Sequence, residues 1–373
     1  MNLAIAAGGT GGHLFPGIAV GEVLRERGHA VMLLISEKEI DALAAQGCPD
    51  FRIEKVRGAG FEGTSPLALL RFFLRFRSGL KQVKALFREF KPNVVLGMGG
   101  FTSTGPILAG RWRKIPTFVH ESNAIPGKAN RLNARLATGV LLSFAVCARK
   151  LPSALCEVTG TPIRRSLKER IPRSQALEAF GLSAERRTLL VMGGSQGAHG
   201  INSAMIEALP ALRDRPLQVV HLTGRDDEEM VREKYALAGV PAFVSAFWNQ
   251  MGIAYSAADF CVARSGAASL AELSLFSLPS VLIPYPFAAE DHQTVNAGIY
   301  ERSGAAVFLA QDAITGDVLA RHLIRFLDDP EYLSAMATVS GMLAQKDAAE
   351  KVANTLLEAC LPPGENPGYF RKS

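Results

Sequence analysis

Short apolar runs alternate with longer segments of helical periodicity along the whole chain, and this alternation restricts the fold more than any other property of the sequence. Many runs contain no polar residue, as at Leu189–Met192, which is typical of strands buried on both faces. The pattern predicts βαβ units and therefore an α/β fold on parallel sheets. We expect strands at 2–7, 30–35, 52–56, 93–97, 116–119, 139–142, 156–158, 188–192, 217–222, 242–244, 259–262, 280–283 and 305–308.

The two halves of the chain repeat one arrangement, in which a strand runs into a glycine loop and then a helix. The strand at 2–7 meets the loop 8–12, and the strand at 188–192 meets the loop 193–197. A chain of 373 residues also suits two domains of roughly 150 residues each. We therefore predict two Rossmann-like, doubly wound parallel-sheet domains that face each other across a ligand cleft.

The domain boundary is expected at Gly160, just before a strongly charged stretch at 164–175. The first domain then comprises 1–160 and the second 161–344. A C-terminal helix from about 345–373 can pack back on the first domain.

A third glycine loop, 97–106, follows the strand at 93–97. Such loops bring backbone N–H groups and a helix N-terminus close to an anion, so three of them favour a diphosphate-bearing ligand. None matches GxGxxG or GxxxxGK[ST], which argues against a standard dinucleotide fold and a P-loop NTPase. The chain contains no DxD, so we expect no metal bridging the diphosphate and no cofactor.

The net charge of +6 is unevenly distributed. Residues 1–160 carry a formal charge of +10, residues 161–373 carry −4, and the segment 67–91 alone holds seven basic residues. A uniformly basic chain would suggest nucleic acid. A basic half joined to an acidic half instead indicates one face with a special partner, and no nucleic acid.

The basic segment reads as an amphipathic helix that begins with the N-cap Ser65 and ends before Pro92, with a break at Ser78-Gly79. One interpretation is a core-facing helix with a solvated basic face. The other is an apolar patch rimmed by cations that lies on anionic lipid. The residues assigned to this membrane patch are Phe72, Phe73, Arg75, Phe76, Lys81 and, from a second basic cluster, Trp112.

Six motifs occur in a fixed order, and together they carry a family resemblance. They are Gly8-Gly9-Thr10-Gly11-Gly12-His13, His120-Glu121-Ser122-Asn123-Ala124, Gly160-Thr161-Pro162-Ile163-Arg164, Gly193-Gly194-Ser195-Gln196-Gly197-Ala198, Arg264-Ser265-Gly266-Ala267 with Glu272, and Asp291-His292-Gln293 with Asn296. The set resembles the MurG family of bacterial glycosyltransferases over residues 1–360.

The resemblance implies a GT-B fold and a metal-independent, inverting transfer of N-acetylglucosamine. The donor would be UDP-N-acetylglucosamine, bound mainly on the second domain. The acceptor would be the 4-hydroxyl of the muramoyl sugar of lipid I, bound on the first domain, and the product β-linked lipid II. The enzyme would lie peripherally on the cytoplasmic face of the bacterial plasma membrane, with other cell-wall synthesis or division proteins as further candidate partners.

The resemblance also implies roles for single residues. Glu272 would accept the ribose hydroxyls, Arg164 and Ser195 would meet the phosphates, and Gln293 would bind the sugar. The family often has glutamine where this chain has His292, which puts one sugar contact in doubt. The donor set is Thr10, Gly11, Gly12, Asn123, Arg164, Ser195, Trp248, Ala267, Glu272 and Gln293, and the acceptor and phosphate loops contribute Gly9, Gly99, Gly100 and Thr102. Trp248 would pack the uracil or fill the core.

Inversion requires a base that takes the acceptor proton while the diphosphate leaves from the opposite side. His13 ends the first glycine loop, and Glu121 lies at the end of the strand at 116–119. We name His13 as the base and Glu121 as its competitor, a choice that the resemblance does not settle.

Two other readings remain open, and a third, a dehydrogenase, is disfavoured because the glycine loops do not match GxGxxG. A second GT-B enzyme, either a diacylglycerol glycosyltransferase or a UDP-N-acetylglucosamine 2-epimerase, would share the two-domain cleft. A non-catalytic nucleotide- or membrane-binding module would not need these polar residues together. A dehydrogenase has only Glu37, near the end of the second strand, in its favour.

Overall fold

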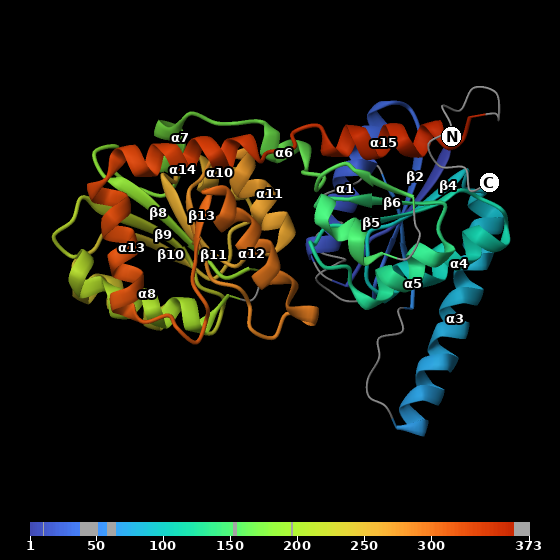
Figure 1. The fold of residues 1–373 in the computed structure, drawn as a ribbon, viewed down its shortest axis with the longest axis horizontal. Helices are drawn as coiled ribbons and strands as arrows, with labels where there is room; N and C mark the ends of the chain where they lie inside the picture. The colour runs from blue at the N-terminus through green and yellow to red at the C-terminus, as the bar shows by residue number, and fades with distance from the viewer. Residues whose placement is uncertain (10, 38–50, 58–64, 152–154, 195–196, 362–373) are drawn as a thin grey trace. The chain divides into compact units, whose positions relative to one another are not determined.

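The computed structural model describes residues 1–373 apart from 10, 38–50, 58–64, 152–154, 195–196 and 362–373. The chain divides into two compact units (Figure 1). The first unit comprises Met1–Arg165 together with the C-terminal segment from Gln345, and the second comprises Ser166–Ala344.

The first unit is built on a parallel sheet of seven strands in the order β3-β2-β1-β4-β5-β6-β7. The order reverses between β1 and β4, which is where doubly wound folds bind ligands at the carboxyl ends of their strands. The strands are β1 (Asn2–Ala6), β2 (Ala30–Ile35), β3 (Arg52–Lys55), β4 (Val94–Gly97), β5 (Thr117–Glu121), β6 (Gly139–Leu142) and β7 (Cys156–Val158).

Alternate side chains of β1 separate the two cores of this unit. Leu3 and Ile5 point to one face, where they pack with helices α1 (Gly11–Glu26) and α15 (Ala348–Glu358). Ala4 points to the other face, together with side chains from the helices α3 (Pro66–Phe90), α4 (Thr104–Trp112) and α5 (Lys128–Leu136). Short 3-10 turns, η1 (Phe101–Ser103) and η2 (Ala145–Lys150), complete the unit.

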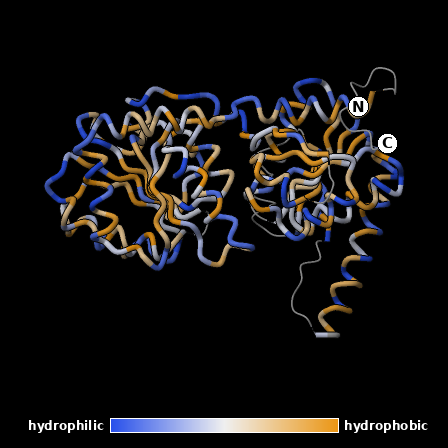
Figure 2. The backbone as a smooth tube through the Cα atoms, viewed as in Figure 1, coloured by the Kyte–Doolittle hydropathy of each residue, from blue (hydrophilic) through white to orange (hydrophobic). Residues whose placement is uncertain are grey.

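The second unit repeats this plan on a parallel sheet of six strands, in the order β10-β9-β8-β11-β12-β13. Figure 2 shows the apolar strands at the centre of each unit. The strands are β8 (Arg187–Met192), β9 (Leu217–Leu222), β10 (Ala242–Ser245), β11 (Phe260–Ala263), β12 (Ser280–Leu282) and β13 (Ala306–Phe308). The helices are α6 (Arg165–Lys168), which starts at the boundary, α7 (Arg173–Ala179), α8 (His199–Leu212), α9 (Glu228–Ala238), α10 (Met251–Ala257), α11 (Ala267–Leu275), α12 (His292–Ser303), α13 (Gly316–Asp328) and α14 (Pro330–Met342), with the 3-10 turn η3 (Ala289–Asp291).

Every strand expected from the sequence is present, with ends that differ by two residues at most. The expected break at Ser78-Gly79 is wrong, because α3 runs without interruption from Pro66 to Phe90. Gly79 serves a close contact instead: a Cβ at this position would collide with the main-chain oxygen of Arg57. The N-cap prediction is confirmed, since Ser65 Oγ accepts a hydrogen bond from the Ala68 N–H at 3.2 Å.

Candidate functional site

His13 lies in the first turn of α1, directly against the glycine loop that follows β4. A Cβ on Gly99 would lie 2.8 Å from His13 Nε2, and one on Gly100 would lie 3.6 Å from His13 Nδ1. Gly99 also has φ +115, a value that strains other residues. The glycines are therefore required for the imidazole to sit between α1 and β4. Of the neighbouring predicted loop residues, Gly9 has φ +102, Gly11 and Gly12 open α1, and Thr10 lies outside the described residues.

Glu121 is the last residue of β5, and its buried carboxylate is saturated by hydrogen bonds. Oε1 accepts from Asn123 N at 2.9 Å and from Asn123 Nδ2 at 3.2 Å. Oε2 accepts from Gly127 N at 3.1 Å and from Asn130 Nδ2 at 2.8 Å. A carboxylate that accepts from this many donors holds the loop 122–127 in place. The Asn123 side chain, predicted to bind the donor, donates a hydrogen bond to Glu121.

His120 is completely buried beside this loop and belongs to the motif 120–124, but no role was predicted for it. Its Nε2 donates to the Gly160 main-chain oxygen at 2.8 Å, and its Nδ1 lies 3.2 Å from Ser122 Oγ. Burial lowers the pKa of His120, so the ring is neutral at physiological pH and links β5 to Gly160. Its place inside the motif was the only signal in the sequence.

Arg164 belongs to the first unit, not to the second as predicted, and its side chain packs on helix α1. The guanidinium carbon is 4.0 Å from the centre of the Phe15 ring, a cation–π contact. Its buried Nε has no hydrogen-bond partner, and no carboxylate among the described residues forms an ion pair with it. Phe15 is thus the platform for a cation whose charge is available to an anionic ligand.

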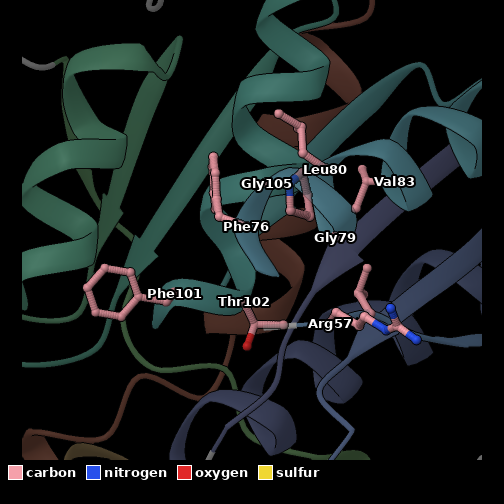
Figure 3. A pocket seen from close by; sticks show the side chains of 10 residues that line it. Arg57, Phe76, Gly79, Leu80, Val83, Phe101, Thr102 and Gly105 are labelled. Carbon is pink, nitrogen blue, oxygen red and sulfur yellow. The ribbon is translucent and has the colours of Figure 1, made fainter. Parts of the chain in front are cut away.

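Thr102, a predicted loop residue, lines a small pocket between α3 and the loop after β4 (Figure 3). Phe76 and Phe101 form its apolar wall, and Arg57 lies at its edge. Thr102 therefore lines this pocket, whereas Gly99 and Gly100 lie against His13.

In the second unit, Glu272 lies on α11 as predicted, half-buried and in the second turn of this helix, which begins at Ala267. Its Oε2 accepts a hydrogen bond from Tyr255 Oη at 2.7 Å, and the Tyr255 ring lies 5.1 Å from that of Phe276. This contact orients the carboxylate. Sequence reasoning missed Tyr255, because nothing in α10 marks it as different from a core tyrosine.

Gln293 lies in the first turn of α12, and the loop before it is strained. Its Oε1 accepts from the Tyr285 N–H at 2.9 Å, and its main-chain oxygen accepts from Ser265 Oγ at 2.8 Å. Glu290 and Asp291 have φ of +57 and +52, in the left-handed region. The acceptor end of Gln293 is therefore engaged, while its Nε2 has no acceptor among the described residues.

Trp248 and Ser195 are two further residues predicted to bind the donor. Trp248 packs with Phe180 and Phe243, with ring centres 5.0 Å and 5.4 Å away, and its Nε1 donates to the Gln250 main-chain oxygen at 3.1 Å. Trp248 therefore belongs to an aromatic cluster of the second unit. Ser195 lies outside the described residues.

The predicted membrane patch divides into two parts. Phe73 is 60% exposed and Trp112 is 55% exposed, with Lys84 Nζ 4.0 Å from the Trp112 ring centre, and Arg75 and Lys81 are exposed. Phe72 and Phe76 are instead half-buried and stack on each other, and Phe72 also meets Phe101. The exposed apolar surface extends further along the N-terminal half of α3, over Leu67, Leu69, Leu70 and Leu74. Among the described residues, no helix is both long enough and apolar enough to cross a bilayer.

Two Rossmann-like units with parallel sheets in this strand order define the GT-B class of fold. Residues 3–142 match the model of the glycosyltransferase family 28 N-terminal domain, and residues 188–352 match that of its C-terminal domain. The chain belongs to glycosyltransferase family 28 and, within it, to the MurG transferases.

Relatives match this chain over nearly its full length. A protein of Geobacter sulfurreducens is 38% identical over 363 residues, covering 96% of this chain and 98% of its own length. One of Anaeromyxobacter dehalogenans strain 2CP-1 is 39% identical over 367 residues, covering 96% and 93%. Both are named UDP-N-acetylglucosamine–N-acetylmuramyl-(pentapeptide) pyrophosphoryl-undecaprenol N-acetylglucosamine transferase.

Solved structures show the same architecture. The crystal structure of MurG from Acinetobacter baumannii has a TM-score of 0.75 at 26% identity and covers 96% of this chain and 99% of its own. A UDP-N-acetylglucosamine 2-epimerase from Neisseria meningitidis has a TM-score of 0.69 at 16% identity, covering 96% of this chain and all of its own, a likeness of fold alone.

Proposed function

We propose that this protein transfers N-acetylglucosamine from UDP-N-acetylglucosamine to the lipid-linked N-acetylmuramoyl pentapeptide that gives its relatives their name. The observation that carries the proposal is 38% identity to such a transferase over 96% of the chain. The residues agree with it: His13 lies at the loops of the first unit, and the oriented carboxylate of Glu272 lies on the second.

In the proposed reaction His13 removes the proton from the acceptor 4-hydroxyl. The hydroxyl oxygen forms a bond to C1 of the donor sugar as the bond from C1 to the diphosphate breaks, with inversion. Arg164 meets the diphosphate charge, since its guanidinium is stacked on Phe15 and pairs with no described carboxylate. Glu272 accepts the ribose hydroxyls, and Gln293 donates from Nε2 to the sugar.

Incubation with labelled UDP-N-acetylglucosamine and a lipid I analogue, with and without EDTA, tests the activity. We expect a disaccharide product that forms only with acceptor and at the same rate in EDTA. Donor turnover without acceptor would show an epimerase or hydrolase instead, and loss of product in EDTA would overturn metal independence.

We further propose that the exposed face of α3 docks on anionic lipid at the cytoplasmic surface of the plasma membrane. Leu70 is 54% and Phe73 is 60% exposed, although apolar side chains of this size are usually covered. Arg71, Arg75 and Arg77 are exposed on the same stretch of helix. Figure 1 shows that this half of α3 extends beyond the sheet and helices of its unit.

Replacing both Leu70 and Phe73 by serine is expected to reduce binding to vesicles of anionic phospholipid at least about tenfold, because burial of each side chain contributes roughly 1.5–3 kcal/mol. Co-sedimentation at low salt measures the effect. Leu237→Ser is a matched control, since Leu237 is 67% exposed on α9 of the second unit. If the double variant binds vesicles as the wild type does, the patch is structural.

A further inference from the structure

The hydroxyl group of Tyr255 lies at the carboxyl end of the second sheet. Tyr255 is 2% exposed on α10, and its Oη lies 3.8 Å from Sδ of Met192, the last residue of β8. Met192 is the register partner of Ala263, the last residue of β11, and the strand order of this sheet reverses between β8 and β11. Doubly wound folds bind ligands at such a reversal, outside the carboxyl ends of the strands. The Tyr255 hydroxyl therefore lies where this class of fold binds a nucleotide.

The hydroxyl donates its proton to Glu272. A phenol has one hydrogen to donate, and the Glu272 Oε2 at 2.7 Å is a stronger acceptor than the thioether sulfur of Met192. The sulfur is therefore a packing contact. Because a hydrogen bond from a hydroxyl to a carboxylate is short and strong, it determines where Oε2 of Glu272 lies.

The Tyr255 ring is itself held in place by its neighbours. Its centre lies 5.1 Å from that of Phe276, and the Phe276 N–H donates to the Glu272 main-chain oxygen at 3.1 Å. The guanidinium carbon of Arg170 lies 5.3 Å from the centre of the Phe276 ring. A glutamate that is free to rotate loses rotamer freedom when it binds a ligand, whereas a carboxylate that is already held does not.

We propose that Tyr255 is a positioning residue for recognition of the donor ribose: its hydroxyl holds the Glu272 carboxylate in place before the ribose hydroxyls bind and stays on Oε2 while they do. This inference deepens the proposed function, because it rests on the role assigned there to Glu272. A carboxylate presents about four lone pairs, of which Tyr255 uses one, so the 2′- and 3′-hydroxyls need not displace it. The ligand class is a nucleoside diphosphate with an intact ribose.

Calorimetric titration of the full chain with UDP and with 2′,3′-dideoxy-UDP tests this. Tyr255→Phe removes only the hydroxyl group, and we expect it to raise the Kd for UDP about tenfold, the factor that a hydrogen bond to a charged group contributes. The Kd for the dideoxy analogue should rise by less than about twofold, because this ligand has no ribose hydroxyls for Glu272 to accept. Equal weakening of both ligands would show a general disturbance of the site and would overturn the proposal.

Tyr300→Phe is the matched control. Tyr300 is a buried tyrosine whose Oη lies 3.0 Å from Ser274 Oγ and 3.2 Å from the Leu270 main-chain oxygen, so it is also hydrogen-bonded to α11. The substitution removes the same group from the same helix without removing a bond to Glu272, so both Kd values should stay within about twofold of the wild type. A control variant that weakens UDP alone, as Tyr255→Phe is expected to do, would contradict the proposal.

The outcomes separate this inference from the proposed function. The titration needs no acceptor, so a protein that forms no disaccharide can still give the expected difference between the two ligands. If Glu272→Ala binds both ligands as the wild type does, the ribose assignment fails and the role of Tyr255 fails with it. If Glu272→Ala weakens UDP alone but Tyr255→Phe does not, only the role of Tyr255 is overturned.

A crystal structure of the wild type with UDP decides the matter if Tyr255→Phe does not fold. Ribose hydroxyls on a Glu272 carboxylate that still accepts from Tyr255 support the proposal. A carboxylate that has left Tyr255, or a ribose that does not reach Glu272, overturns it.

Discussion

Replacement of His13 by alanine is expected to lower kcat by about 10²-fold or more, because a positioned general base contributes 10²–10⁴-fold to such a step. The binding of UDP-N-acetylglucosamine should persist, since no donor contact is assigned to the imidazole. Single-turnover kinetics with a lipid I analogue measure the first quantity, and calorimetric titration with the donor measures the second.

His29→Ala is the matched control for this experiment. His29 lies next to the N-terminal amino group, with Nδ1 3.3 Å away, at the opposite end of α1 from the glycine loop. The His29→Ala variant should have the same kcat as the wild type. If His13→Ala retains full kcat, the base must be sought elsewhere in the first unit.

Replacement of Glu121 by alanine is expected to lower the free energy of unfolding by about 3 kcal/mol or more, since each buried donor left unmatched costs roughly 1–3 kcal/mol. The orphaned donors are the main-chain N–H groups of Asn123 and Gly127 and the side-chain amide of Asn130. Urea denaturation followed by circular dichroism measures the loss. Turnover should fall with it, because the loop 122–127 loses its anchor.

Glu157→Ala is the control for Glu121. Glu157 lies in β7 of the same unit, and its Oε2 accepts a single hydrogen bond, from Thr355 Oγ1 at 3.0 Å. The Glu157→Ala substitution should lower the free energy of unfolding by less than about 1.5 kcal/mol, the range of a typical single hydrogen bond. A Glu121→Gln variant that unfolds like the wild type but has lost 10²-fold in kcat would instead show that Glu121 takes the proton.

Much of the fold could be predicted because its signals are local. The apolar run Leu189–Met192 can be stable only when it is covered on both faces, so it reads as a buried strand wherever it occurs. The break expected at Gly79 was wrong because a glycine in a helical pattern has two meanings. It can weaken a helix, or it can admit another backbone, and here it admits the main-chain oxygen of Arg57, more than twenty residues earlier in the chain.

The same distinction between local signals and long-range contacts applies to the candidate site. His13 and Gly99 could be singled out from their glycine loops, but their contact depends on α1 and β4 meeting at the point where the strand order reverses. The sequence neighbours of Glu121 do not reveal the four donors around its carboxylate. Phe15 and Arg164 are far apart in the chain, and Tyr255 and Glu272 lie on different helices, so neither contact could be predicted from the local sequence.

The amino-acid sequence alone determined that this protein is an α/β chain of two similar halves, with glycine loops after its strands and a basic amphipathic helix. Strand burial, loop chemistry and amphipathicity depend on short stretches of residues, so they can be predicted from the local sequence. Only the tertiary structure decided which polar groups are available and which are engaged, because hydrogen-bond saturation depends on every neighbour of an atom. That is why the four donors around the buried Glu121 carboxylate, which make it the anchor of its loop, became visible only in the structure.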